Sequence, residues 1–164
     1  MLLSDVENKI DGMMLDLINA LEKEGVDRFF NHPDTIKQHL KLTDQDIEEL
    51  QRESVFYCEN KDWEHAIPAL QWLTFFEPLH ANHFVRLGCA LLLTEQYEPA
   101  LNVLETSLDL DRENPETTLY IGNCLRKLGN NEHAKLFFQE TIDLCHGKLQ
   151  YKPILHLAQQ ALQT

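Results

Sequence analysis

The side chains of this chain that could do chemistry are four cysteines and eight histidines, and neither group forms a recognisable site. No two cysteines are close enough in sequence for a C-x-x-C pair, which predicts reduced thiols rather than a disulfide framework. The cysteines are Cys58, Cys89, Cys124 and Cys145. His80 and His83 have a ligand-like spacing, with Cys89 downstream, but no second ligand pair follows. We interpret them as surface or capping residues and expect neither a metal nor a cofactor.

Motifs that carry catalytic chemistry are missing as well. The sequence has no glycine-rich loop that could cradle a phosphate, no G-x-S-x-G elbow, no H-E-x-x-H and no Rossmann glycine fingerprint. Its acidic residues fall mainly on predicted solvent-exposed faces. We therefore predict that the protein is not an enzyme and that its function lies in binding.

The net charge of −13 limits what the chain can bind. Nucleic acids and anionic membrane surfaces both need a positively charged footprint, so we predict neither as a partner. No apolar run approaches the roughly 18 residues of a membrane-spanning helix, and residues 1–5 lack the features of a signal peptide. We expect a cytoplasmic protein without membrane insertion, whose partners are proteins with basic or apolar segments.

One sequence pattern occurs three times between residues 47 and 148, without gaps and with a period of 34 residues. Two columns hold small residues: Ser54, Gly88 and Gly122 in one, and Ala66, Ala100 and Ala134 in the other. Three columns hold mostly large side chains: Tyr57, Leu91 and Leu125; Trp63, Tyr97 and Asn131; and Leu70, Leu104 and Phe138. Small residues let two helices approach closely, and the large ones fill the remaining space. The pattern predicts an all-α fold of stacked helical hairpins, typical of tetratricopeptide repeats.

We predict three parts in the chain. Residues 1–43 form an N-terminal helical segment, and residues 44–148 hold the repeats, at about 47–80, 81–114 and 115–148. Residues 149–164 hold a capping helix, from about 153 to 163, which covers the apolar face of the last repeat. Turns between the two helices of a repeat are expected at residues 60–62, 94–96 and 129–130, because these stretches are polar or contain glycine.

Residues 4–24 predict an amphipathic helix that belongs to no repeat. Ser4 and Glu7 match a capping box, and apolar residues between Val6 and Leu21 form one stripe. This stripe needs a surface to cover it, so the helix either folds back onto the repeats or pairs with its copy in a homodimer. A shorter helix is expected within residues 33–40, and Thr43 with Asp46 predicts the cap of the first repeat.

The first helices of stacked hairpins line a concave inner face. Within each repeat, places 2, 5, 9 and 12 lie on the stripe opposite to the packing residues, and this stripe also includes Glu48, Glu116 and Arg126. The predicted peptide-binding residues on it are Gln51, Val55, Cys58, Asn82, Val85, Cys89, Leu92, Leu119 and Asn123. The middle of this groove is apolar, and its amide side chains could bond a peptide backbone, which favours an extended apolar ligand. Alternatively, the N-terminal helix or neighbouring repeats cover some of these residues.

Several short stretches of the repeats resemble one family. They are residues 47–57, 60–66, 86–90, 95–97, 123–125 and 128–134, including Gly88-Cys89-Ala90 and Asn123-Cys124-Leu125. Over about residues 44–146 the chain resembles the class II chaperones of bacterial type III secretion, which are the small acidic chaperones of translocator proteins. The resemblance implies a cytoplasmic chaperone that holds an extended, proline- and leucine-containing segment of a translocator in its groove. It also implies homodimers formed through N-terminal helices.

The first repeat departs from this family, whose groove positions there are often aromatic. Gln51, Val55 and Cys58 take their place, which predicts a smaller and more polar pocket. Two other functions compete. An adaptor that clamps a C-terminal carboxylate needs basic residues where repeat three has Glu116 and Tyr120, and the acidic side chain counts against it. A scaffold subunit of a larger complex would have its groove filled by a neighbouring helix.

Overall fold

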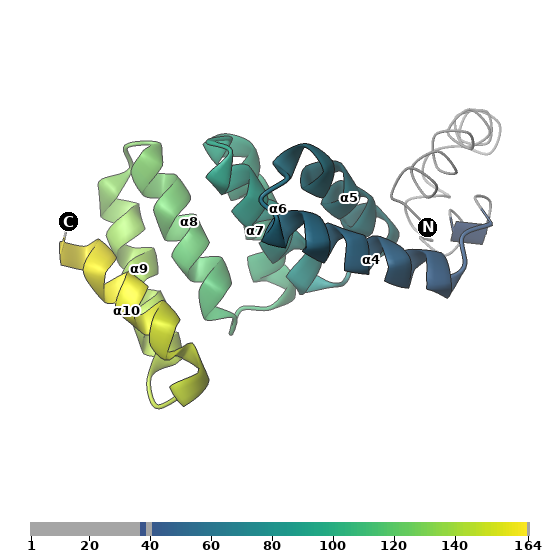
Figure 1. The fold of residues 1–164 in the computed structure, drawn as a ribbon. Helices are drawn as coiled ribbons and strands as arrows, with labels where there is room; N and C mark the ends of the chain where they lie inside the picture. The colour runs from purple at the N-terminus through teal and green to yellow at the C-terminus, as the bar shows by residue number, and fades with distance from the viewer. Residues whose placement is uncertain (1–36, 39–40, 164) are drawn as a thin grey trace. The chain divides into compact units, whose positions relative to one another are not determined.

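The computed structural model describes residues 37–38 and 41–163 of the chain (Figure 1). The predicted helices at 4–24 and 33–40 lie wholly or mainly outside these residues, so the role of the N-terminal segment stays a prediction. The chain divides into two compact units, Met1–Pro78 and Leu79–Thr164, which are described separately below. All regular structure in the described ranges is helical, as predicted. Within those ranges, no helix is long and apolar enough to cross a bilayer.

The described part of the first unit contains one helical hairpin, formed by α4 (Asp44–Glu59) and α5 (Trp63–Phe76). The start of α4 is the predicted capping box. The Asp46 N–H donates to Thr43 Oγ1 at 3.2 Å, and the Thr43 N–H donates to Asp46 Oδ2 at 2.7 Å. Ser54 and Ala66 of the two small columns and Leu70 of one large column are fully buried, so these columns face the inside of the hairpin.

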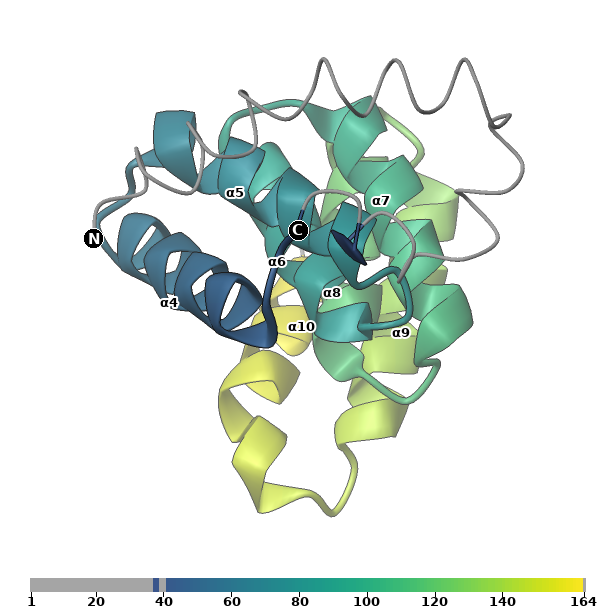
Figure 2. The same cartoon turned by 90° about the vertical axis from the view of Figure 1, so that its right-hand side faces the viewer.

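The second unit contains two further hairpins and a terminal helix (Figures 1 and 2). The helices are α6 (Ala81–Leu93), α7 (Tyr97–Leu110), α8 (Pro115–Lys127), α9 (Asn131–Cys145), a 3-10 turn η1 (Leu149–Tyr151) and α10 (Lys152–Gln163). Each helix packs against the next one in the chain, and α8 also contacts both α6 and α10. Helices α6, α8 and α10 therefore follow one another as neighbours.

The turn inside each hairpin has the same backbone geometry. Lys61, Glu95 and Gly129, which are 34 residues apart, all have positive φ angles, of 57°, 62° and 83°. Only the third of them is a glycine, which adopts this left-handed conformation without steric cost. The turns lie where the sequence predicts them, and the conformation repeats even where the residue type does not.

The glycines of the small column touch the large column of the paired helix. A Cβ atom built on Gly88 would lie 2.5 Å from Leu104 Cδ2, and one on Gly122 would lie 2.6 Å from Phe138 Cε1. Real Cβ atoms do not approach so closely, so any larger residue at either position would force Leu104 or Phe138 to move. The predicted close contact between the two helices of a repeat is confirmed in both hairpins of the second unit.

Buried hydroxyl groups tie α8 to the helices on both sides. Thr117 Oγ1 lies 3.3 Å from Ser107 Oγ on α7, and Thr118 Oγ1 lies 2.9 Å from Thr141 Oγ1 on α9. Ser107 Oγ also donates to the carbonyl oxygen of Ala81 at 3.2 Å. Because buried polar atoms are costly without partners, these pairs fix the position of α8 along its neighbours.

The last helix covers the third repeat, as predicted for a capping helix. Ala158 of α10 is fully buried in one cluster with Leu119, Ala134 and Phe138. Half-buried apolar residues of α10 surround this contact: Ile154, Ala161 and Leu162. Helix α10 therefore completes the core of the second unit and also becomes one wall of its ligand face.

A candidate peptide-binding face

The three predicted groove residues of the first unit, Gln51, Val55 and Cys58, are half-buried on α4. The amide of Gln51 donates from Nε2 to Glu77 Oε2 at 2.9 Å. This bond holds the side chain within its own unit. A peptide would therefore have to compete with Glu77 for the Gln51 amide.

On α6, the predicted residues differ in how far they reach the surface. Asn82 is exposed, Cys89 and Leu92 are half-buried, and Val85 is only 4% exposed. Cys89 and Leu92 thus offer apolar surface on the inner stripe of this helix. Val85 contributes mainly to the core.

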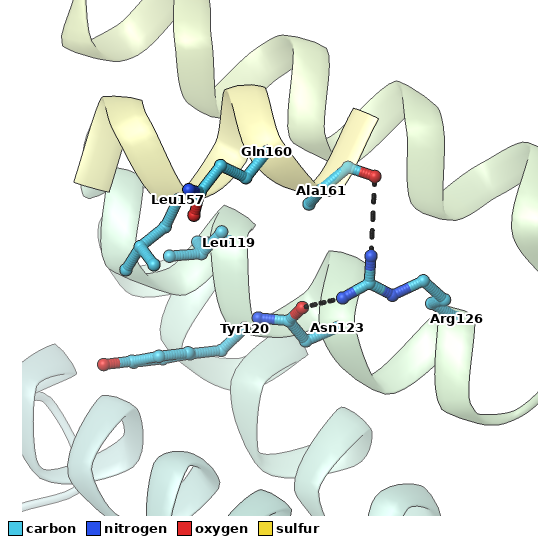
Figure 3. A pocket seen from close by; sticks show the side chains of 7 residues that line it. All are labelled: Leu119, Tyr120, Asn123, Arg126, Leu157, Gln160 and Ala161. Carbon is cyan, nitrogen blue, oxygen red and sulfur yellow. Dashed lines mark hydrogen bonds between the residues drawn. The ribbon is translucent and has the colours of Figure 1, made fainter. Parts of the chain in front are cut away.

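Helices α8 and α10 enclose a pocket of about 300 Å³ (Figure 3). Two predicted residues, Leu119 and Asn123, lie in it, although Leu119 is only 4% exposed and also belongs to the core. The residues that line this apolar pocket are Leu119, Tyr120, Asn123, Arg126, Leu157, Gln160 and Ala161. Among these described lining residues, Arg126 carries the only formal charge. The pocket is therefore suited to an apolar side chain, and it has one polar wall.

Arg126 holds that polar wall in place. Its Nη2 donates to Asn123 Oδ1 at 3.1 Å, and its Nη1 donates to the carbonyl oxygen of Ala161 on α10 at 3.4 Å (Figure 3). The guanidinium also lies over the ring of Phe138, 5.2 Å from its centroid. With Oδ1 occupied by Arg126, the Nδ2 of Asn123 lies on the Tyr120 side of the pocket, where it can donate to a ligand carbonyl.

Tyr120 connects the apolar pocket to α6, since its hydroxyl lies close enough to the Cys89 thiol for each group to shift the pKa of the other. Burial raises the pKa of Tyr120, and the neighbouring Cys89 raises it further. Burial also raises the pKa of Cys89, although the neighbouring Tyr120 hydroxyl partly offsets this, and burial raises the pKa of Cys124 to about 11. All three groups are uncharged at neutral pH, so they present a neutral surface to a ligand.

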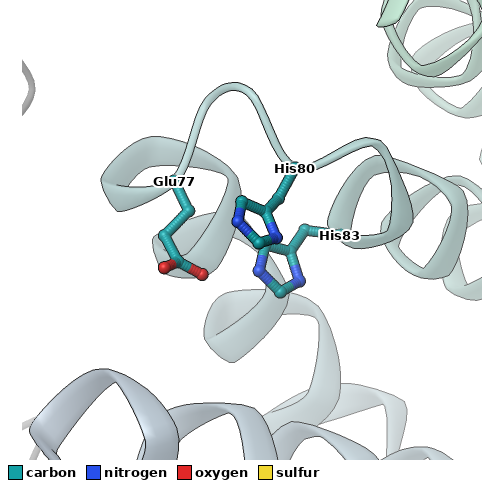
Figure 4. A group of neighbouring side chains, drawn as sticks. All are labelled: Glu77, His80 and His83. Carbon is teal, nitrogen blue, oxygen red and sulfur yellow. The ribbon is translucent and has the colours of Figure 1, made fainter. Parts of the chain in front are cut away.

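The two histidines at the start of α6 are stacked on each other (Figure 4). Their ring centroids are 5.3 Å apart and the rings are inclined by 15°. His80 occupies the N-cap position and is exposed, as predicted for a surface or capping residue. For His83 that prediction is wrong, because its side chain turns inward beneath His80 and is only 5% exposed.

Sequence reasoning missed the wall that α10 contributes to the apolar pocket, namely Leu157, Gln160 and Ala161, and it missed Tyr120. Leu157 is apolar and yet 52% exposed. The repeat pattern ends before α10 and therefore says nothing about which of its residues face α8.

Comparison with protein-family models gives no match. One curated relative, named as a BBSome complex member BBS4 homolog of Drosophila melanogaster, is 29% identical over 83 residues, which are 51% of this chain. The chain spans only 17% of the length of that relative. This likeness therefore concerns about half of this chain and a small part of the relative.

Solved structures match far more of the chain. A chain of a type III secretion complex from Aeromonas hydrophila has a TM-score of 0.74 and 18% identity, and covers 85% of this chain and 93% of its own. The Yersinia enterocolitica chaperone SycD, solved with a peptide of the translocator YopD, has a TM-score of 0.71 and 18% identity, with coverages of 74% and 93%.

PcrH of Pseudomonas aeruginosa, solved with the chaperone-binding region of PopB, has a TM-score of 0.69 and 21% identity, with coverages of 74% and 98%. At such identities these likenesses show the fold. The fold is that of the type III secretion translocator chaperones, the family that the sequence resemblance indicates.

Proposed function

We propose that the protein is a type III secretion chaperone that binds an extended segment of a hydrophobic secreted translocator and keeps it soluble and competent for secretion. The observation that carries this proposal is the apolar pocket between α8 and α10, which opens beside the neutral Tyr120–Cys89 pair in a strongly acidic chain. The fold supports it, because structures of the same fold have been solved with translocator peptides.

The inner face of the second unit offers what an extended segment needs. Such a segment presents side chains on alternate sides and leaves its backbone groups available for bonding. Cys89, Leu92 and Tyr120 provide half-buried apolar surface, while Asn82 and Asn123 provide amide groups. Anchoring would therefore come from apolar side chains, with a few backbone bonds that set the direction of the segment.

The predicted site residues differ in how well they serve as test positions. Val85 and Leu119 are each 4% exposed, so an aspartate there would disrupt the core and abolish binding for a trivial reason. Leu92 and Tyr120 are half-buried and can be shortened with less damage. Gln51, Val55 and Cys58 remain proposed contacts of the first unit.

The test begins with the natural client. The tagged protein is purified from its native host, the co-purified partner is identified, and limited proteolysis maps the protected segment. A synthetic peptide of that segment is then titrated by calorimetry. Leu92→Ala and Tyr120→Ala should weaken binding by about 5- to 50-fold, as expected for truncated apolar anchors. Leu136→Ala is the matched control, because Leu136 is 66% exposed on α9.

Two outcomes would contradict the proposal. One is equal affinity of the peptide for the wild type and for the Leu92 and Tyr120 variants. The other is a host strain that lacks the protein and still secretes normal amounts of the identified partner. A chaperone predicts that this partner is lost or aggregates inside the cell.

A scaffold subunit is the second candidate function, favoured by the similarity to a protein named as a member of a complex. The nature of the co-purified material separates the two. A stable assembly of several subunits in fixed ratio indicates a scaffold. A single secreted protein that aggregates when released indicates a chaperone.

A cytoplasmic location and a homodimer formed through residues 4–24 belong to the same proposal. Sedimentation of the full chain and of a chain that starts at residue 37 measures the dimer directly. Loss of the dimer in the shorter chain is the expected result, and an unchanged mass would contradict it.

A further inference from the structure

A second pocket of the second unit lies where the start of α7 meets the end of α8. Its volume is about 300 Å³, and it shares no lining residue with the apolar pocket between α8 and α10. It is lined by Glu95, Gln96, Tyr97, Glu98, Pro99 and Leu128, and we call it the acidic pocket. Because the two pockets have no residue in common, both can be occupied at the same time.

Half of the residues that line the acidic pocket are apolar. Tyr97 and Pro99 belong to the first turn of α7, where Tyr97 is half-buried and Pro99 is exposed. Leu128, at the C-cap of α8, is 40% exposed. Together these side chains offer a contact surface for one aliphatic or aromatic side chain of a ligand.

The charged residues that line the pocket are both acidic. Glu95 and Glu98 are exposed, and among the described residues neither carboxylate has an ion-pair partner. Lys127 also lies nearby, with its Nζ 6.0 Å from the centroid of the Tyr97 ring, but it does not line the pocket. One cation beside two carboxylates leaves a net negative charge, which a lysine or arginine of a ligand complements.

The repeat pattern explains Glu98 but not Glu95. A glutamate lies in the first turn of all three second helices, as Glu64, Glu98 and Glu132, where it offsets the positive end of the helix. Glu95 has a φ angle of 62°, at the turn position that Gly129 takes in the next hairpin. Glycine adopts this conformation without steric cost, so the geometry of the turn gives no reason for a glutamate.

We propose that the acidic pocket is a docking site for a second protein, which binds through a segment with a lysine or arginine within two positions of an aliphatic or aromatic residue. The apolar side chain packs on Tyr97, Pro99 and Leu128, and the cation reaches Glu95 and Glu98. A second copy of this chain is a poor match, because two chains of net charge −13 repel each other. The inference goes beyond the proposed function, since this partner binds a chaperone whose client face is already occupied.

The probe is a library of N-acetylated, C-amidated decapeptides, compared in pools for binding to the purified full-length protein. Each pool has one apolar residue and, within two positions of it, lysine, arginine, glutamine or glutamate. The wild type should bind the lysine and arginine pools more tightly than the glutamine pool, and the glutamate pool least. Glu95→Gly should reduce this basic preference by about two- to fivefold, as for an exposed ion pair. Because glycine suits the turn, this variant should keep the unfolding temperature of the wild type.

Glu98→Gln and Glu132→Gln form a matched pair. Both remove one charge from the first turn of a second helix, but only Glu98 lines the acidic pocket. Glu98→Gln should lower the basic preference by about two- to fivefold, and Glu132→Gln should leave it unchanged. Leu128→Ala should weaken binding of the basic pools by a similar factor through lost apolar contact, whereas Leu136→Ala, at an exposed leucine of α9, should not.

Three results would overturn the inference and leave the chaperone proposal standing. The first is the absence of any basic preference in the wild type. The second is an equal loss in Glu98→Gln and Glu132→Gln, which would indicate a general attraction to an acidic chain. The third is a basic preference that Leu92→Ala or Tyr120→Ala abolishes, because those residues belong to the client face. Failure of the client-peptide titration would overturn the chaperone proposal without affecting this site.

Photo-crosslinking identifies the occupant of the pocket. Benzoylphenylalanine at Gln96, which lines the acidic pocket, should crosslink in living cells to a protein that carries such a basic and apolar segment and is not the client. Crosslinks from this position only to the client, or only to a second copy of the chain, would overturn the assignment to a second protein.

Discussion

The hairpins α6–α7 and α8–α9 have the same packing but different inner faces. Gly88 meets Leu104 in the first hairpin, and Gly122 meets Phe138 in the second, at places that are 34 residues apart. On the inner face, the places of Val85, Cys89 and Leu92 in α6 are taken in α8 by Leu119, Asn123 and Arg126. The packing columns of the repeat are thus held nearly constant, while the inner face changes from apolar to amphipathic.

This difference indicates where specificity lies in the second unit. Helix α6 offers sulfur and aliphatic surface, which binds apolar segments with little selectivity. Helix α8 adds an amide and a guanidinium held by a hydrogen bond, and α10 closes the cleft next to them. We infer that α6 contributes general affinity and that α8 with α10 selects the client sequence.

The largest effect is expected where the packing columns meet. Gly122→Val should lower the free energy of unfolding by about 3 kcal/mol, because the added carbons clash with Phe138. Urea unfolding followed by circular dichroism measures this loss. Lys127→Val is the control, because it places a valine at an exposed position of the same helix and so measures the cost of the low helix propensity of valine. A loss no greater than that of the control would show that the two helices can separate at little cost.

The thiol of Cys124 allows a test of how tightly α8 is packed. Burial raises the pKa of Cys124 to about 11 from its ordinary value of 9.0, so its thiolate is about a hundredfold scarcer at pH 8. Iodoacetamide labelling of Cys124, followed by mass spectrometry, should be slower than in urea by at least this factor. Raising the pH should increase the labelling rate of the folded chain until the pH exceeds the pKa of Cys124. Equal rates in the folded and the unfolded chain would contradict the buried position of Cys124.

The buried hydroxyls allow a test of how α8 is held. Thr141→Val removes one of the two hydrogen-bond partners of the Thr118 hydroxyl, the other being the Pro115 carbonyl, and should cost about 1–2 kcal/mol in the free energy of unfolding. Thr141→Ser keeps the hydroxyl and should lose less. Thermal unfolding of the two variants side by side measures the difference. If valine is tolerated as well as serine, the bond between α8 and α9 contributes no stability.

The smallest effect is expected for the polar groups of the inner face. Asn123→Ala should weaken binding of the mapped client peptide by about fivefold, equivalent to one hydrogen bond of about 1 kcal/mol. Cys89→Ala, at the corresponding place of α6, should change it by less than about twofold. Calorimetric titration compares the two. A larger effect at Cys89 would reverse the assignment of selectivity to α8.

Much of the fold could be predicted from the sequence because packing constrains residue type at fixed intervals. Trp63, Tyr97 and Asn131, which are aligned in the sequence, are the first residues of α5, α7 and α9. Gly88 and Gly122 lie at close helix contacts that only small residues permit. Each of these positions is determined by its nearest neighbours in the repeat.

The inner face was less predictable, because periodicity gives the direction of a side chain and not what covers it. Leu119 points to the predicted face but is nearly buried, since it lies in the core cluster with Ala158 of α10. Helix α10 lies outside the repeat pattern, so the register could not show that Leu157 and Gln160 complete the pocket.

Photo-crosslinking tests the central claim, that the inner face of the second unit binds a client segment, most directly. Benzoylphenylalanine is placed at Gln160, at the edge of the apolar pocket, and separately at Leu136, exposed on α9. The account predicts that the client is crosslinked in living cells from position 160 and not from position 136. Crosslinks from position 136 with none from position 160 would contradict it.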